Sequence, residues 1–161
     1  MRHIHKEELY FKKNNFSDAL FDEHSIFFDI ETTGFSPKHS VCYLIGCAYR
    51  KDEHLFIEQF FAENTEEECC IIQAFLDLLS DFDTIISFNG VGFDVPFLKA
   101  KCDILGIQEN LLTYNYLDIF KAVSEIKFLL KLPNYKQKTI EDFLGLDRDD
   151  KYSGGELINV D

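Results

Sequence analysis

Two acidic residues, separated by a single residue, stand at the end of a short apolar run. The segment reads Phe27-Phe28-Asp29-Ile30-Glu31-Thr32-Thr33-Gly34. Successive side chains of a β-strand alternate between faces, so we expect Asp29 and Glu31 to point the same way. Two carboxylates at the end of a buried strand repel each other and resist loss of hydration. A hard divalent cation with oxygen ligands would neutralise them; the alternative is two exposed polar residues in a turn.

A third acidic residue follows another apolar segment, after a loop with two glycines. The loop reads Asn89-Gly90-Val91-Gly92-Phe93-Asp94. Asp94 suits a helix N-cap, because Asp is preferred there and Pro96 fits an early helical position. The loop offers more than a cap requires: the Asn89 amide, close approach at the glycines, and the Phe93 ring, on which a base can stack. Asp94 would also face the usual ligand crevice of an α/β sheet.

The elements that position these acids follow from the hydrophobic pattern. Strands are expected at residues 25–31, 41–49, 54–61, 83–88 and 111–117, and helices from residue 64 or 65, after Pro96, at 118–130 and at 137–144. The second and third strands, joined by a short polar loop, predict an antiparallel hairpin. Strands first and then helices alternating with strands predict a mixed five-stranded α/β sheet flanked by helices. We expect residues 1–24 to be a lead-in and residues 25–161 to be one domain.

The composition bounds the function. The 161 residues carry a net charge of −13, which argues against a non-specific nucleic-acid binder with a basic patch. It does not exclude an enzyme that meets phosphates through bound cations, because a metal reverses the local sign. No apolar stretch is long enough to span a bilayer, and residues 1–15 lack the apolar core of a signal peptide, so a cytoplasmic location without membrane partners is expected.

Five cysteines, an odd number, are spread over the chain. None forms a Cys-x-x-Cys pair, and the spacing fits no usual zinc-ligand pattern. We expect reduced thiols, most of them in the core.

The two acidic segments, in this order, resemble the first two motifs of the DEDD superfamily of 3′–5′ exonucleases, which has a ribonuclease-H-like fold. The later segments 132–145 and 153–158 resemble a bacterial branch of ribonuclease-H-like exonucleases. The resemblance covers roughly residues 25–161. It implies a metal-dependent 3′–5′ exonuclease that hydrolyses terminal phosphodiester bonds at the single-stranded 3′ end of DNA or RNA.

The resemblance also implies roles for individual residues. Two ions, Mg²⁺ or Mn²⁺, would be held by carboxylates. Asp29 would bridge both ions, Glu31 would bind the ion that carries the attacking water, and Asp94 would complete the second ion site. The substrate-binding residues would be Thr32, Thr33, Asn89 and Phe93.

The departure from the family lies in its third motif, which carries a fourth carboxylate preceded by a His or Tyr. All five histidines precede the second motif, so the His type is unsupported. Tyr152 and Glu156 have the Tyr-x-x-x-acid spacing, but two glycines between them disfavour a helix. Asp118 is another candidate, although it suits an N-cap, and Asp147, Asp149 and Asp150 suit a solvated turn. Two expectations stay open: a truncated chain, or a catalytically incomplete module that binds nucleic acid or protein.

Overall fold

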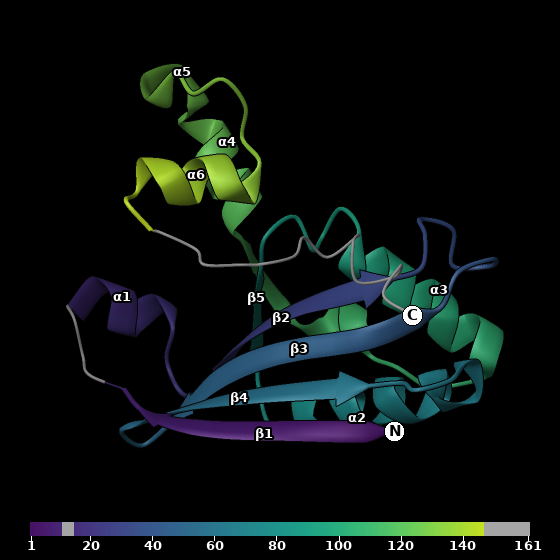
Figure 1. Cartoon of the computed structure of the whole chain (residues 1–161). Helices are drawn as coiled ribbons and strands as arrows, with labels where there is room; N and C mark the ends of the chain where they lie inside the picture. Colours follow the sequence, from purple (N-terminus) through teal and green to yellow (C-terminus); the bar gives the residue numbers. More distant parts are fainter. Residues whose placement is uncertain (11–14, 147–161) are drawn as a thin grey trace.

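The protein is described by a computed structural model that covers residues 1–10 and 15–146. Six strands form one sheet, and helices lie to either side of it (Figure 1). The strands are β1 (Arg2–Leu9), β2 (Ser25–Thr32), β3 (Cys42–Lys51), β4 (His54–Phe61), β5 (Thr84–Ser87) and β6 (Asn115–Asp118). The helices are α1 (Asn15–Leu20), α2 (Glu68–Leu79), α3 (Asp94–Leu105), α4 (Ile119–Glu125), α5 (Lys127–Leu130) and α6 (Gln137–Phe143), with 3-10 turns η1 (Thr65–Glu67) and η2 (Leu111–Thr113).

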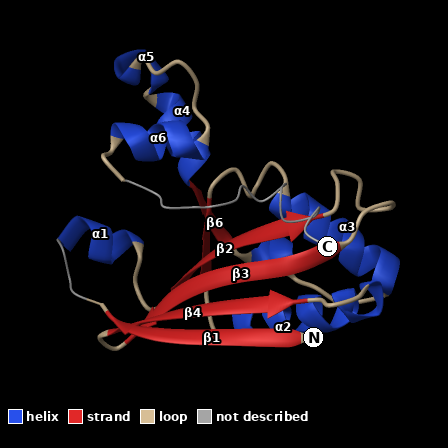
Figure 2. Ribbon diagram, in the orientation of Figure 1, coloured by secondary structure: helices blue, strands red, loops and turns tan. Residues whose placement is uncertain are grey.

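The sheet order is β1-β4-β3-β2-β5-β6 (Figure 2). The first four strands in this order pair antiparallel, whereas β2 pairs parallel with β5 and β5 with β6. The β3–β4 hairpin is confirmed, and so is the mixed α/β sheet flanked by helices. The carboxyl ends of the parallel strands β2, β5 and β6 therefore lie at one edge of the sheet, where ligands of α/β sheets usually bind.

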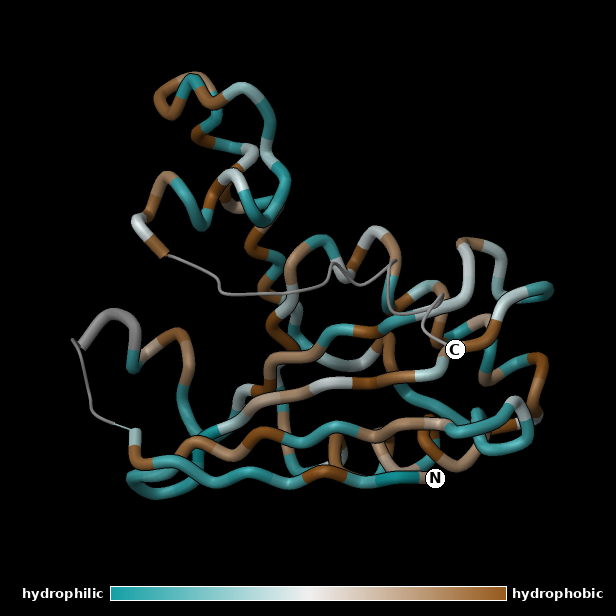
Figure 3. Tube along the Cα trace, viewed as in Figure 1, coloured by the Kyte–Doolittle hydropathy of each residue, from teal (hydrophilic) through white to brown (hydrophobic). Residues whose placement is uncertain are grey.

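The count of five strands is wrong, because residues Arg2–Leu9 of the expected lead-in add a sixth strand, β1. All eight residues of β1 are exposed, and Figure 3 shows that the strand is hydrophilic along most of its length. No buried face imposed an alternating pattern, so the hydrophobic period could not reveal it. Instead, the ladder to β4 and bonds from the imidazoles of His3 and His5 to buried Glu58, at 2.6 and 2.7 Å, hold the strand.

One face of the sheet carries the hydrophobic core. Ile26, Phe28 and Ile30 of β2 are buried against apolar side chains of α2 and α3. The Phe28 ring stacks on Phe75 of α2 with ring centroids 5.2 Å apart. The other face of β2 carries Phe27, Asp29 and Glu31, and the Phe27 ring meets Phe21 edge-on at 5.2 Å.

The five cysteines are all free thiols. Cys42, Cys47 and Cys102 are buried as expected, but Cys69 is half-buried and Cys70 is exposed. The two adjacent cysteines fall outside the buried stripe of α2, which at helical spacing is made by residues 68, 71, 72, 75, 76 and 79.

Two expected elements are divided in the structure. The expected strand 111–117 begins with η2, because the fully buried Leu111 anchors a turn in which the Thr113 hydroxyl donates to the Asn110 carbonyl at 2.7 Å. The expected helix 118–130 breaks at Ile126, where the backbone leaves the helical region, to give α4 and α5. Within residues 1–10 and 15–146, every helix is too short or too polar to span a bilayer.

Candidate active site

Strand β2 positions the first two acids. Ile26, Phe28 and Ile30 face the core, so the alternate residues Asp29 and Glu31 lie on the opposite face, Asp29 exposed and Glu31 half-buried. The pairing with β3 shifts register between Glu31 and Thr32, so β2 is irregular immediately after the second acid. The alternation that the sequence predicts therefore places both carboxylates on the face of the sheet away from the core.

Asp94 lies at the end of β2 as well, although it is 64 residues away in the sequence. The backbone N–H of Ile30 donates to Asp94 Oδ1 at 3.1 Å, and Ile30 is the residue between Asp29 and Glu31. Asp94 is only 5% exposed. It is the first residue of α3 rather than its N-cap: Phe93 occupies the cap position and makes no side-chain cap bond. The N-cap interpretation is therefore wrong, because the carboxylate bonds across to β2.

The glycine loop between β5 and α3 is shaped by its own side chains. A Cβ at Gly90 would lie 2.5 Å from Ser87 Oγ, and one at Gly92 would lie 2.8 Å from Asn89 Oδ1. Asn89 adopts a positive φ of 62°, and its carbonyl accepts from the N–H groups of Gly92 and Phe93 at 3.0 and 3.2 Å. The close approach expected at the glycines thus exists, and it is made by Ser87 and Asn89. This tight loop fixes where Asp94 begins α3.

Asp118 is a structural carboxylate. It is 6% exposed and caps α4 by accepting from the N–H groups of Phe120 and Lys121 at 3.0 and 3.3 Å. It also accepts from the N–H groups of Asn89 and Val91 at 2.9 and 3.2 Å. Four backbone donors occupy its oxygens, so Asp118 holds the glycine loop rather than offering a free metal ligand. The other candidates for a fourth carboxylate, Glu156, Asp147, Asp149 and Asp150, lie outside the described residues.

Burial and the charge of Asp29 disfavour ionisation of the other two acids of the site. Burial, followed by the charge of Asp29, raises the pKa of Glu31. Burial, followed by the charge of Asp29, raises the pKa of Asp94 to about 6. A bound cation would relieve both effects. Within the described residues, however, no three His, Cys, Asp or Glu side chains converge as a ready-made metal-ligand group. The structure brings Asp29, Glu31 and Asp94 to one strand end without closing them around a common point.

The threonine hydroxyls near the acids bond within the turn after β2, and the aromatic rings near the acids contact each other. The Thr32 hydroxyl donates to the Gly34 carbonyl at 2.9 Å, and the Thr33 hydroxyl accepts from the N–H of Val41 at 2.9 Å. Both therefore shape the turn after β2. Phe93 meets Phe35 edge-on at a centroid distance of 5.9 Å, and Phe35 is 90% exposed. Phe35 is not among the residues predicted from the sequence, where its one signal is a large apolar side chain in the turn cluster after Gly34.

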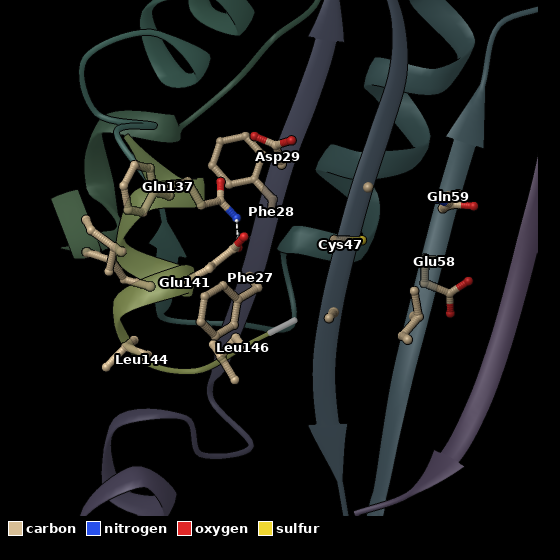
Figure 4. Close-up of a pocket in the computed structure, with 16 residues that line it drawn as sticks. Phe27, Phe28, Asp29, Cys47, Glu58, Gln59, Gln137, Glu141, Leu144 and Leu146 are labelled. Carbon is tan, nitrogen blue, oxygen red and sulfur yellow. Dashed lines mark hydrogen bonds between the residues drawn. The ribbon is translucent and has the colours of Figure 1, made fainter. Parts of the chain in front are cut away.

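A cavity of 460 Å³ opens on the Asp29 face of the sheet, between β2–β4 and α6. Figure 4 shows Gln137 and Glu141 of α6 next to Phe27, Phe28 and Asp29 of β2. Gln137 Nε2 donates to Glu141 Oε1 at 2.8 Å, which aligns both side chains along α6. Most of the remaining wall is apolar, so Asp29 stands at the border of a hydrophobic hollow that α6 covers.

Comparisons with known proteins agree with this architecture. The family model of the RNase_H superfamily matches residues 26–160. A DNA polymerase of Methanocaldococcus jannaschii is 36% identical over 63 residues, which are 39% of this chain and 4% of that protein.

Two solved structures are similar in fold. The family B DNA polymerase of Pyrobaculum calidifontis superposes with a TM-score of 0.63 at 19% identity, over 77% of this chain and 18% of the polymerase. Exonuclease I of E. coli, in a zinc-bound complex with single-stranded DNA, superposes with a TM-score of 0.62 at 11% identity, over 79% and 36%. The chain thus spans a minor part of each of these relatives. By its family match and its sheet topology, it belongs to the RNase_H superfamily and has the fold of ribonuclease-H-like 3′–5′ exonucleases.

Proposed function

We propose that this protein is a metal-dependent 3′–5′ exonuclease that removes nucleotides from single-stranded nucleic-acid ends. One observation carries the proposal: Asp94 bonds to the backbone of Ile30, between Asp29 and Glu31, so two distant acidic motifs meet at one strand end. The family match and the exonuclease and polymerase relatives support a nuclease-type function.

Carboxylate oxygens suit hard divalent cations, so Asp29, Glu31 and Asp94 are the residues that would hold Mg²⁺ or Mn²⁺. Such a pair of ions, when bound, activates water and stabilises the leaving 3′ oxygen. The charge of Asp29 raises the pKa of both Glu31 and Asp94, so a cation held by Asp29 would favour the ionised form of the other two acids as well. The ions would also reverse the sign of an acidic site in a chain of net charge −13, which would otherwise repel phosphates.

The protein's own groups would orient the terminal nucleotide. Phe35 and Phe93 present aromatic faces next to the acids, and bases of any identity stack on such rings. Asn89 holds the loop from which Phe93 projects, while Thr32 and Thr33 hold the facing turn. These contacts would position the last phosphodiester without reading the sequence. A cytoplasmic location remains a prediction from the sequence.

A digestion assay tests the proposal. A single strand labelled at its 5′ end, incubated with Mg²⁺ or Mn²⁺, should shorten one nucleotide at a time, and chelation with EDTA should stop the reaction. Asp29→Ala should lose turnover by several orders of magnitude, whereas Asp81→Ala, which alters an exposed loop, should not. Turnover that survives Asp29→Ala would reject this site, and internal cuts would indicate an endonuclease.

A second candidate function is a catalytically incomplete module that binds nucleic acid or a protein. It is favoured by the lack of three converging metal-ligand side chains in the described part of the chain. Binding of a single strand without turnover at any concentration of Mg²⁺ or Mn²⁺ would support this alternative. Metal-dependent turnover by the wild-type chain would exclude it.

A further inference from the structure

Residues 119–138 differ in charge from the rest of the chain. They contain five lysines and one glutamate, in a protein whose net charge is −13. The lysines are Lys121, Lys127, Lys131, Lys136 and Lys138. All five are exposed, and within residues 1–10 and 15–146 none of them forms a salt bridge with a carboxylate. We call residues 119–138 the basic segment.

The basic segment lies at the edge of the sheet where the parallel strands β2, β5 and β6 have their carboxyl ends. Figure 2 shows α4, α5 and α6 projecting beyond the end of β6, away from the helices α2 and α3 that cover the core face. A hollow of 580 Å³ lies between α4 and the chain leading into α6, with Asn89, Tyr135 and Lys136 among its walls. Phe88 and Gln137 line both this hollow and the cavity that contains Asp29. The two hollows therefore abut, and the basic segment contributes residues to both of them.

The loop that carries Lys136 is held in place by hydrogen bonds. Asn134 Oδ1 accepts from the Lys136 N–H at 3.1 Å and from the Thr139 hydroxyl at 2.6 Å. The Tyr135 hydroxyl donates to the Lys127 carbonyl at 2.8 Å, which ties this loop to α5. A loop fixed in this way loses little conformational freedom when it binds a ligand.

The chemistry of this hollow, which Lys136 lines, and of the exposed lysines in the rest of the basic segment fits a polynucleotide. Ammonium groups pair with phosphates, and aromatic rings receive unpaired bases. Phe120 lies edge-on to Phe88 at 5.8 Å in the hollow, and Phe128, between Lys127 and Lys131 in sequence, is 70% exposed. We propose that the basic segment and the adjoining hollow bind the single strand upstream of the terminal nucleotide, with lysines on its phosphates. This inference rests on the proposed function, because the strand bound by the basic segment is the substrate of the proposed exonuclease site.

Electrostatics supplies a quantitative signature. For a single strand, the logarithm of the binding constant falls with the logarithm of salt concentration by about 0.7 for each phosphate neutralised. Replacing three lysines that contact phosphates should therefore lower the slope by about 2. Lysines elsewhere in the chain should contribute little to the slope.

The test is fluorescence anisotropy with a 5′-fluorescein 20-mer of deoxythymidine, in EDTA so that no strand is cut. The triple variant Lys127→Gln, Lys131→Gln and Lys136→Gln should bind at least about tenfold more weakly at 50 mM salt and lose about 2 from the salt slope. The matched control is Lys6→Gln with Lys51→Gln, two exposed lysines of β1 and β3, which should bind within twofold of wild type.

Three outcomes would overturn the inference. They are no binding by the wild-type chain at 50 mM salt, unchanged affinity and slope in the triple variant, or binding to vesicles containing phosphatidylserine in place of the oligonucleotide. Cleavage is measured separately with Mn²⁺. If Asp29→Ala loses turnover but the triple variant binds the oligonucleotide as well as wild type does, this inference is wrong and the proposed exonuclease function stands. If the wild type binds the oligonucleotide through these lysines but shows no turnover, the proposed exonuclease function is wrong and the binding surface stands.

Discussion

Asp94 should make the metal-free protein less stable at neutral pH. Burial, together with the charge of Asp29, raises the pKa of this carboxyl from 3.8 to about 6. A carboxyl that is harder to ionise in the folded state than in the unfolded state favours folding while it is protonated. That stabilisation is fully present below pH 4 and is lost as pH rises through about 6. The difference between the two pKa values corresponds to about 3 kcal/mol.

The substitution Asp94→Asn removes the charge and keeps an oxygen that can accept from the Ile30 N–H. We expect Asp94→Asn and wild type to be equally stable at pH 4. From pH 7 upwards the variant should be more stable by up to about 3 kcal/mol. Urea unfolding in EDTA, repeated from pH 4 to pH 8, measures the difference.

Asp81→Asn is the matched control, because Asp81 is exposed and should show no such pH-dependent gain. Mn²⁺ should reduce the advantage of Asp94→Asn, since an ion that binds only the folded wild type stabilises it by mass action. A variant that is less stable than wild type at pH 7, or a difference that does not change with pH, would refute this view of Asp94.

Three further substitutions test the supports of the site. Lys101→Met should cost about 3–5 kcal/mol in urea unfolding, because it leaves buried Glu68 without the ammonium group 3.0 Å away. Lys99→Met, which breaks a half-buried pair with Glu109, should cost less than Lys101→Met, and equal losses would argue against a special role of the buried Lys101–Glu68 pair. Gly90→Ala should cost about 1–3 kcal/mol because its Cβ would lie 2.5 Å from Ser87 Oγ, whereas Gly46→Ala has nothing within 4 Å and should unfold like wild type. Glu58→Gln should speed amide hydrogen exchange across β1, because Glu58 accepts from His3 and His5 of β1, and should leave exchange in β2 unchanged. Exchange rates in β1 equal to those of wild type would argue against this role of Glu58.

The sequence revealed the parts of the fold that carry a regular pattern. The alternation in β2 and the apolar stripe of α2 each bury one face, so periodicity located them closely. The polar strand β1 has no buried face, and its position depends on Glu58, 50 or more residues away, which a local pattern cannot show. The position of β1 is therefore set by its pairing with β4, which is distant in the sequence.

In the candidate site too, local pattern predicts some positions, and others depend on contacts between distant residues. Asp29 and Glu31 share a strand, so their common face follows from local geometry. The role of Asp94 depends on a bond to Ile30 across 64 residues, and a local reading favoured a helix cap instead. Asp118 shows the reverse: the cap was expected from sequence, but its bonds to Asn89 and Val91 come from the parallel packing of β5 beside β6. Phe35 was missed because an exposed ring in a turn has no periodic signal.

We propose above that Asp29, Glu31 and Asp94 form one divalent-metal site. Titration of the wild-type chain with Mn²⁺, followed by the electron paramagnetic resonance signal of the free ion, tests it directly. We expect saturable binding that Asp29→Ala and Asp94→Ala each weaken at least tenfold, while Asp81→Ala leaves it unchanged. Binding that is equally tight in wild type, Asp29→Ala and Asp94→Ala would contradict the claim.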